Sequence, residues 1–267
     1  MARRITAPRI QRMKGKGKKV VMVTAYDATF ARLVDSADVD AVLVGDSLGN
    51  VIQGHETTLP VTLEEMIYHT RCVSRGLTRP LLVGDLPFLS YQASVEQAVI
   101  SAGRLMKEGR ANAVKLEGGA CMAKAVRRLV DIGIPVMGHI GLTPQSVHAF
   151  GGMKIQGRED QRAEQILADA KALEEAGVFS IVLEGLPTPL AKRVTESVEV
   201  PTIGISAGPH CDGQVLVLYD MLALDETFKP RFVKHYASMG ATVVDALNRF
   251  SSEVREGAFP DEEHSFE

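Results

Sequence analysis

Acidic side chains end, or directly follow, short apolar runs at four places in the sequence. A lysine two residues before one of these acids and a histidine at the end of a fifth run add two more ionisable groups. If the runs are parallel strands, their carboxyl ends face one way, and these side chains are expected to meet at one edge of the sheet. They are Asp46, Asp85, Glu117, Glu184, Lys115 and His139.

Carboxylates gathered in a partly buried site repel one another unless a cation or shared protons compensate. Oxygen ligands without a cluster of His or Cys favour a hard divalent ion, Mg²⁺ before Mn²⁺, and disfavour zinc. Such an ion can chelate the keto oxygen and carboxylate of an α-keto acid and stabilise its enolate. A carboxylate that does not bind the ion can then act as base. The pattern predicts metal-assisted carbonyl or enolate chemistry.

Taken singly, each of these side chains also has a structural explanation. An Asp after a strand is often the N-cap of the next helix, and a single His is often a hydrogen-bonded core residue. Acids on four separate strands favour the chemical interpretation.

Two sequence patterns alternate from Lys19 onward. One is a short run of β-branched residues, and the other is a longer stretch with helical spacing of apolar residues. This alternation predicts βα units, and continuous Val, Ile and Leu runs predict parallel strands buried on both faces. An eighth strand is expected near residues 215–218, where a helix fits equally well. The other predicted strands are 20–25, 41–45, 81–85, 113–117, 135–139, 180–184 and 201–206.

Helix starts and ends are also marked. Thr62 with Glu65, and Ser94 with Gln97, have the spacing of capping boxes, in which side chains satisfy free N–H groups at a helix start. Three glycines before later strands predict helix ends at which glycine adopts a positive φ. These are Gly109, Gly133 and Gly177.

Seven or eight βα units without a linker between them favour an α/β fold of the (β/α)₈ TIM-barrel type over an open doubly wound sheet. Neither a G-x-G-x-x-G motif after the first strand nor a P-loop is present, which disfavours nucleotide binding. We predict a single barrel domain over residues 1–267. It has a basic N-terminal arm or short lead-in helix at 1–19, and C-terminal helices at 231–239 and 241–256 within a segment 229–267 that caps the barrel or reaches a neighbouring subunit.

Charge and composition exclude several function classes. Thirty basic against 33 acidic residues leave a net charge of −3, so no global positive field attracts nucleic acid or anionic lipid. No apolar run approaches the roughly 20 residues of a membrane span, and the N-terminus lacks a secretory signal. A mitochondrial presequence is the alternative to an arm at 1–19, and Pro8 disfavours it. Three cysteines without metal-ligand spacing suit a reducing compartment, so we expect a cytoplasmic protein.

Short motifs distributed along the chain indicate a resemblance to a known family. They are Val44-Gly-Asp-Ser-Leu-Gly49 with Gln53-Gly-His55, Asp85-Leu-Pro-Phe88, Val114-Lys-Leu-Glu-Gly-Gly119, Gly138-His-Ile-Gly-Leu-Thr-Pro-Gln-Ser146, Phe150-Gly-Gly152 with Gln156-Gly-Arg158, and Asp212-Gly-Gln214. Each motif alone would be weak. In this order and spacing, from about residue 5 to the Glu-Glu-His-Ser-Phe ending, the sequence closely resembles the ketopantoate hydroxymethyltransferase family.

The resemblance implies hydroxymethyl transfer from 5,10-methylenetetrahydrofolate to 3-methyl-2-oxobutanoate (α-ketoisovalerate). The product, 2-dehydropantoate (ketopantoate), serves pantothenate biosynthesis. The resemblance also implies a Mg²⁺-stabilised enolate with one Mg²⁺ per subunit, a (β/α)₈ barrel and a homo-oligomer, commonly a decamer. By position, it implies metal ligands at Asp46, Asp85 and Glu117, substrate contacts at Asp46, Ser47, Asp85 and Lys115, the proton acceptor at Glu184, and further catalytic groups at Lys115 and His139.

Other functions fit the sequence less well. A Mg²⁺-dependent carbon–carbon lyase or mutase of the phosphoenolpyruvate mutase and isocitrate lyase type is expected to carry a nucleophilic cysteine in a flexible loop, and no cysteine here has that context. A non-catalytic barrel that only binds is expected to have lost the strand-end acids. One departure from the family is visible in Gly204-Ile-Ser-Ala-Gly208, where the family usually has glycine at the third position. Ser206 is expected to narrow a loop near the folate or the substrate.

Overall fold

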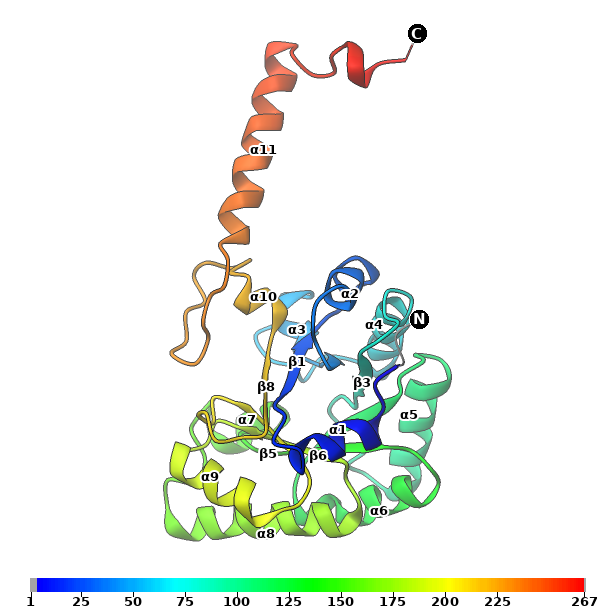
Figure 1. Ribbon diagram of the computed structural model, residues 1–267, viewed down its shortest axis with the longest axis vertical. Helices are drawn as coiled ribbons and strands as arrows, with labels where there is room; N and C mark the ends of the chain where they lie inside the picture. The colour runs from blue at the N-terminus through cyan, green and yellow to red at the C-terminus, as the bar shows by residue number, and fades with distance from the viewer. Residues whose placement is uncertain (1–3, 267) are drawn as a thin grey trace. The chain divides into compact units, whose positions relative to one another are not determined.

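The computed structural model describes residues 4–266, in which eight parallel strands close into a barrel (Figure 1). Each strand pairs with the next in sequence, and β1 pairs with β8 from Val20 opposite Gly213 to Val23 opposite Leu216. Because the sheet closes on itself, the open doubly wound alternative is excluded. The strands are β1 Val20–Thr24, β2 Ala41–Val44, β3 Leu81–Asp85, β4 Ala113–Glu117, β5 Val136–Gly141, β6 Ser180–Glu184, β7 Thr202–Ile205 and β8 Gly213–Leu216.

The seven strands predicted without a helical alternative are confirmed, and each boundary agrees within two residues. The eighth begins two residues earlier than expected. A short helix, α10 (Leu218–Met221), starts just after it, so the ambiguous apolar run holds the end of a strand and the start of a helix.

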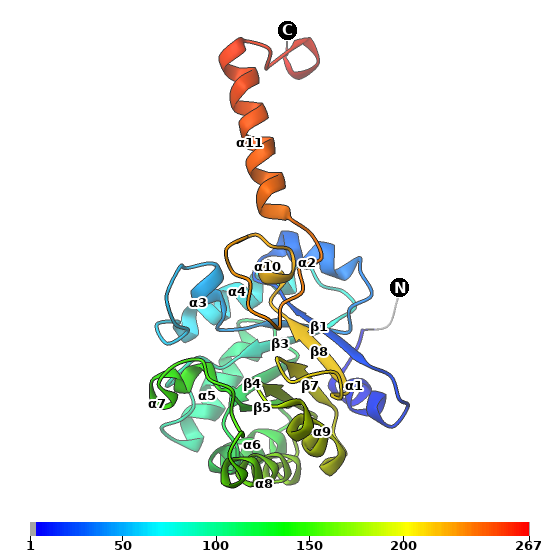
Figure 2. The same cartoon turned by 90° about the vertical axis from the view of Figure 1, so that its left-hand side faces the viewer.

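Helices connect most successive strands and cover the outside of the barrel (Figures 1 and 2). The link from β7 to β8 departs from this rule, since residues 206–212 form turns without a helix. None of the helices in the described chain has the length and apolar character that crossing a membrane requires. The helices before β8 are α1 Ala7–Lys14, α2 Ala28–Asp35, α3 Leu48–Val51, α4 Leu63–Ser74, α5 Val95–Lys107, α6 Ala123–Asp131, α7 Val147–Phe150, α8 Asp160–Ala176 and α9 Thr188–Ser197, with 3₁₀ turns at Ala120–Met122 and Pro144–Ser146.

The two predicted capping boxes differ. At the start of α4 both bonds form: Thr62 Oγ1 accepts from the Glu65 N–H, and the Glu65 carboxylate accepts from the Thr62 N–H. At the start of α5 Ser94 Oγ accepts from the Gln97 N–H, but Gln97 Oε1 accepts from Ala93. The second box is therefore only half formed.

Two of the three predicted glycine helix ends adopt a positive φ, 88° at Gly133 and 97° at Gly177. Gly109 does not, and the following Arg110 takes φ 63° instead. A Cβ at Gly109 would lie 2.6 Å from the carbonyl oxygen of Leu105, so close approach, rather than backbone conformation, requires glycine there.

An apolar cluster fills the barrel interior at the amino ends of the strands. It includes Ile5, Ala7 and Ile10 from the N-terminal segment, so residues 5–10 close this end of the barrel. Lys14, at the end of α1, donates to the carbonyl oxygens of Thr195 and Val198. The lead-in helix expected within 1–19 thus forms and is anchored, whereas residues 1–3 lie outside the described residues. The strand residues of this interior cluster are Val20, Met22, Ala41, Leu43, Leu81, Val83, Ala113, Met137, Val182, Ile203 and Val215, and Phe179 joins it from just before β6.

The chain divides into two compact units, with the boundary between Leu216 and Val217 rather than at residue 229. In the second unit, α11 (Met239–Glu256) confirms the helix predicted at 241–256. The helix predicted at 231–239 does not form, and that prediction is wrong. The reason is that the N–H groups of Tyr236 and Met239 donate to the carbonyls of Met221 and Leu222, so they are unavailable for helical bonds within the segment.

Candidate active site

The predicted ionisable residues reach one end of the barrel because side chains along a strand alternate between its two faces. On four strands, the residue two positions before the ionisable one belongs to the apolar interior cluster: Val83, Ala113, Met137 and Val182. Two residues further along the same strands, on the same inner face, are Asp85, Lys115, His139 and Glu184. Glu117 takes the next inner position on β4 after Lys115. The carboxyl half of the barrel therefore carries ionisable groups where the amino half carries apolar ones.

Asp46 and Ser47 come from the turn after β2. The Asp46 N–H lies 3.4 Å from Asp85 Oδ2, which brings the two aspartates to the same place. Asp46 does not cap α3, because Ser47 stands at the N-cap and makes no capping bond through its side chain. The Ser47 hydroxyl instead lies 2.8 Å from the Tyr26 hydroxyl. The N-cap explanation for Asp46 is thus excluded.

Ion pairs join the buried groups into one cluster. Lys115 Nζ lies 2.9 Å from Asp85 Oδ2. The His139 ring stands between two acids, with Nδ1 3.4 Å from Glu117 Oε1 and Nε2 3.2 Å from Glu184 Oε2, although the second contact lacks hydrogen-bond geometry. Side-chain exposure is 5% or less for all of these except Glu184, at 20%. Glu184 is therefore the acid best placed to meet a molecule entering from solvent.

A close approach between β5 and β6 brings His139 and Glu184 together. The Leu142 N–H donates to the carbonyl oxygen of Glu184 at 2.8 Å. Gly141, with φ 98°, makes this possible, since a Cβ there would lie 2.3 Å from that same oxygen. Glycine is required at the end of β5 for both reasons.

Burial and neighbouring charge shift the pKa values of the cluster. Burial raises the pKa of Asp46 well above its usual range, and the negative charges of Asp85 and Glu117 raise it further. Burial also raises the pKa of Asp85, although Lys115 opposes this. Burial lowers the pKa of Lys115, but the adjoining carboxylates outweigh it and keep this side chain positively charged. The aspartates are thus held in an environment that disfavours their negative charges.

The charge of His139 depends on opposing neighbours. Burial and the nearby Lys115 lower its pKa, but the carboxylates of Glu117 and Glu184 outweigh them and raise the pKa to about 9. Lys115 Nζ lies 3.2 Å from His139 Nδ1, a contact that suits a neutral ring accepting a hydrogen bond. Because two acids face the ring, we take the imidazolium as the dominant form of the protein without a bound cation.

Two residues with no assigned role in the sequence analysis hold this cluster in place. Gln145 donates from Nε2 to Asp46 Oδ2 at 3.0 Å and from its backbone N–H to Glu117 Oε2 at 3.0 Å. Its Oε1 accepts from the Tyr91 hydroxyl at 2.8 Å, which sets the orientation of the amide. Gln145 lies in the 138–146 motif, and that motif was the only sequence signal for it. Neutral polar residues in loops form no periodic pattern.

The carboxylates of the cluster fit a divalent cation. Four carboxylates face one lysine and one histidine, which leaves a charge of −2 when all are ionised. Asp85 Oδ1 is buried and has no hydrogen-bond partner. Over residues 4–266, however, no three His, Cys, Asp or Glu side chains are arranged as a metal-binding group. One oxygen of Glu117 accepts from the Gln145 N–H and the other faces His139 at 3.4 Å, so the ligand set of Asp46, Asp85 and Glu117 stays a prediction.

Comparison with known proteins extends these observations to the whole chain. Residues 4–262 match the family model described as ketopantoate hydroxymethyltransferase. The 3-methyl-2-oxobutanoate hydroxymethyltransferase of Pelobacter propionicus is 56% identical over 266 residues, an alignment covering 100% of this chain and 98% of that protein. The enzyme of the same name from Anaeromyxobacter sp. (strain K) is 58% identical, covering 98% of this chain and 87% of that protein.

Solved structures with similar folds include enzymes of another group. A 2,3-dimethylmalate lyase of the PEP mutase/isocitrate lyase superfamily has a TM-score of 0.62 at 16% identity, covering 99% of this chain and 93% of that one. A phosphonopyruvate hydrolase has a TM-score of 0.63 at 11% identity, covering 98% and 92%. At such identities the likeness concerns the fold alone. The sequence matches decide the family: the chain belongs to the ketopantoate hydroxymethyltransferases.

Proposed function

We propose that the protein transfers a hydroxymethyl group from 5,10-methylenetetrahydrofolate to 3-methyl-2-oxobutanoate, giving 2-dehydropantoate for pantothenate biosynthesis. The observation that carries this proposal is the meeting of Asp46, Asp85, Glu117, Lys115 and Glu184 at one end of the barrel. Membership in the family supports the choice of reaction over the lyase or mutase alternative, which rests on fold similarity alone.

Asp46, Asp85 and Glu117 would hold a Mg²⁺ ion. We expect Mg²⁺ rather than zinc because the donors are carboxylate oxygens. The ion would supply Lewis acidity that polarises the keto oxygen of the substrate and so acidifies its C3–H bond.

Lys115 and Ser47 would orient the oxo acid. Lys115 Nζ carries a positive charge at the centre of the cluster, where it can attract the substrate carboxylate or the oxygen that becomes negative during reaction. Ser47, at the first turn of a short helix, offers a hydroxyl and an N–H group. Both residues would restrict the substrate to a pose in which C3 faces Glu184.

Glu184 would remove the C3 proton onto a carboxylate oxygen. It is the most exposed acid of the cluster, and His139 Nε2 beside Oε2 would orient it as a positioning group. The resulting carbon nucleophile would form a C–C bond to the methylene carbon of the donor while the bond from that carbon to one folate nitrogen breaks. Water would displace the second folate nitrogen and supply the hydroxyl oxygen. The proton taken from C3 and one proton of the water would complete the two N–H groups of the tetrahydrofolate that leaves.

Deuterium exchange at C3 of 3-methyl-2-oxobutanoate in D₂O, without folate, tests this proposal. We expect exchange that requires Mg²⁺ and that Glu184→Gln abolishes. Glu196→Gln, at an exposed position on α9, is the matched control and should exchange like the unmodified protein. Exchange that survives removal of the metal, or that persists in Glu184→Gln, would contradict the proposal.

We further propose a homo-oligomer, of the decameric kind implied by the family, that works in the cytoplasm. No residue of α11 is buried in the single chain, and an apolar stripe runs along it. A second copy that covers this stripe is the simplest explanation. Free cysteines throughout suit a reducing compartment. Light scattering should give a multiple of the chain mass that falls when Leu247 and Phe250 are both changed to Asp. The stripe comprises Val243, Val244, Leu247, Phe250 and Val254.

A further inference from the structure

The loop after β3 presents two large apolar side chains to solvent. Phe88 is 41% exposed and Leu89 is 59% exposed. Leu89 has a backbone φ of 62°, in the left-handed region that non-glycine residues rarely adopt. Strained backbone of this kind persists only where the surrounding structure enforces it, and it is concentrated at functional sites.

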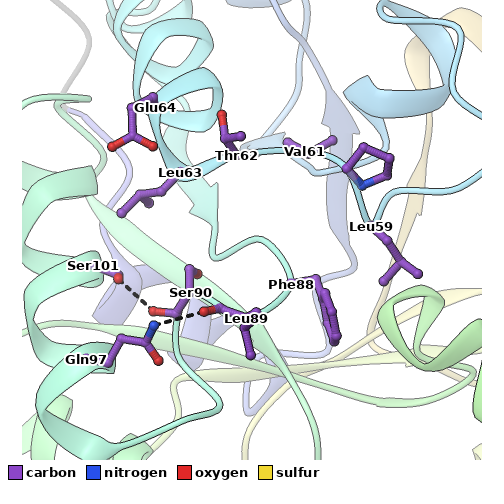
Figure 3. Close-up of a pocket in the computed structure, with 11 residues that line it drawn as sticks. Leu59, Val61, Thr62, Leu63, Glu64, Phe88, Leu89, Ser90, Gln97 and Ser101 are labelled. Carbon is purple, nitrogen blue, oxygen red and sulfur yellow. Dashed lines mark hydrogen bonds between the residues drawn. The ribbon is translucent and has the colours of Figure 1, made fainter.

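Side-chain hydrogen bonds hold this loop firmly against α5 (Figure 3). Gln97 Nε2 donates to the carbonyl oxygen of Leu89 at 2.9 Å, and Ser101 Oγ donates to that of Ser90 at 2.6 Å. Ser90 Oγ in turn donates to the carbonyl oxygen of Pro87 at 2.7 Å. The exposure of Phe88 and Leu89 is therefore built into the loop and does not result from a loose chain.

The loop forms one wall of a pocket of about 420 Å³, and residues 59–64 form another. Figure 3 shows Phe88 and Leu59 on one side of this pocket. A volume of this order suits part of a small-molecule ligand. The apolar lining residues are Leu59, Pro60, Val61, Leu63, Phe88 and Leu89.

One wall of the pocket is connected directly to the acidic cluster. Phe88 follows Asp85 by three residues, so their Cα atoms lie at most about 11 Å apart. The intervening Leu86 accepts at its carbonyl oxygen from Gln145 Nε2, the same group that donates to Asp46. The wall formed by the β3 loop thus begins at a residue that we assign to the oxo acid and its metal.

The polar side chains of the pocket already have partners. Thr62 and Glu65 form the capping box, and Glu64 pairs with Arg104 at 2.7 Å. What remains to contact a ligand is mainly apolar surface beside an aromatic ring. Such a lining suits a flat aromatic group rather than a charged one.

We propose that this pocket binds the aminobenzoyl ring of the folate donor. This inference rests on the proposed function. The one-carbon unit of the donor bridges N5 and N10, and N10 carries the aminobenzoyl ring, so the reacting carbon and this ring are close neighbours in one molecule. With the oxo acid at the carboxylates, a ring held against Phe88 would bring the methylene carbon toward C3.

Paired kinetic measurements on Phe88→Ala test the proposal. We expect the KM for 5,10-methylenetetrahydrofolate to rise roughly tenfold to a hundredfold, as loss of a buried aromatic contact predicts. The Mg²⁺-dependent exchange at C3, which needs no folate, should keep its rate and its KM for the oxo acid. Phe88→Tyr, which keeps a ring, should restore the donor KM. Ile100→Ala, an exposed apolar residue outside the pocket, is the matched control.

Leu89→Gly provides a second variant, because glycine relieves the strained φ while it removes apolar surface. It should raise the donor KM without lowering the melting temperature. Calorimetric binding of tetrahydrofolate to Phe88→Ala gives a readout independent of turnover, and the affinity should fall by a similar factor. An absence of C3 exchange in the unmodified protein would contradict the proposed function. The binding measurement would still show whether the pocket binds the folate.

Three outcomes would overturn the inference. One is an unchanged donor KM and an unchanged tetrahydrofolate affinity in Phe88→Ala. Another is a parallel loss of C3 exchange, which would place Phe88 with the oxo acid. The third is a change of oligomeric mass at unchanged donor KM, which would make this surface a contact between copies of the chain.

Discussion

The two ends of the barrel are built from the same strands and differ in almost every other respect. On β4, Ala113 belongs to the apolar interior cluster, and Lys115 two residues later is paired with an aspartate. On β5, Met137 and His139 repeat the contrast. The amino end is closed by the segment around Ile10, while the carboxyl end holds ionisable groups that burial makes costly.

This difference separates stability from chemistry. Apolar burial at the amino end contributes directly to folding. Charges at the carboxyl end must recover their desolvation cost from one another, and the residual negative charge is left for a cation to balance. A barrel can tolerate such an end because the rest of its interior is apolar. Each variant below should therefore change the property of the end that carries it and leave the other end of the barrel unchanged.

The largest effect is expected for Glu184→Gln. Loss of the general base should lower turnover by roughly 10²- to 10⁴-fold. The melting temperature should change little, because relief of the excess negative charge is offset by the lost contact with His139. Turnover and thermal unfolding measured on one preparation check both statements. A large loss of stability would show that Glu184 supports the fold rather than the reaction.

At the opposite end, Ile10→Ala should act on stability alone. Ile10 is fully buried against the strand interiors, so truncation should lower the free energy of unfolding by about 2–4 kcal/mol. Urea unfolding measures the loss, and kcat well below the melting temperature should not change. Leu33→Ala, at an exposed position on α2, is the control. A reduced kcat in folded Ile10→Ala would break the separation of the two ends.

Gln145→Leu should weaken the carboxyl end by an intermediate amount. It removes the amide that donates to Asp46, and it removes the closest hydrogen-bond partner of the Tyr91 hydroxyl. The cost of an unpaired buried polar group, about 1–3 kcal/mol, corresponds to roughly a tenfold to hundredfold change in affinity. We expect weaker Mg²⁺ binding by calorimetry. Unchanged metal affinity would indicate that Gln145 only supports the fold.

The charge of His139 predicts a smaller, pH-dependent effect in protein stripped of divalent ions. Its pKa of about 9 in the folded state exceeds the ordinary value of 6.5, so its contribution is fully present below about pH 6.5 and is lost as pH rises through 9. The melting temperature should therefore fall over this range, and less so in His139→Asn. An equal slope in both proteins would assign the fall to other groups.

The smallest change is expected at the departure from the family pattern. Ser206 adopts φ 53°, in the left-handed region where glycine is favoured, which gives a physical reason for the glycine that the family resemblance leads us to expect there. Relief of strain in Ser206→Gly is partly offset by the greater flexibility of the unfolded chain, so the gain should be about 0.5–1 kcal/mol. Thermal unfolding measures it, and a decrease would mean that the serine side chain makes a stabilising contact.

Much of the fold and half of the site follow from local sequence. The apolar runs predicted the strands because parallel strands are buried on both faces. The acids at their ends predicted a common site because all the strands point one way. Lys115 was assigned correctly to the face of Glu117 by the two-residue period alone. These inferences need only the chain itself and the regular geometry of a strand.

Long-range contacts decided the rest. The tertiary structure paired Lys115 with Asp85, placed Gln145 and Tyr91 behind the carboxylates and set the Glu117 carboxylate between Gln145 and His139. It also drew the segment at 231–239 into bonds with α10 instead of a helix. Residues far apart in sequence meet only after the barrel has closed, and no periodicity records which of several possible partners lies nearest. The sequence by itself determined which groups reach the mouth of the barrel, and the fold determined how they are connected there.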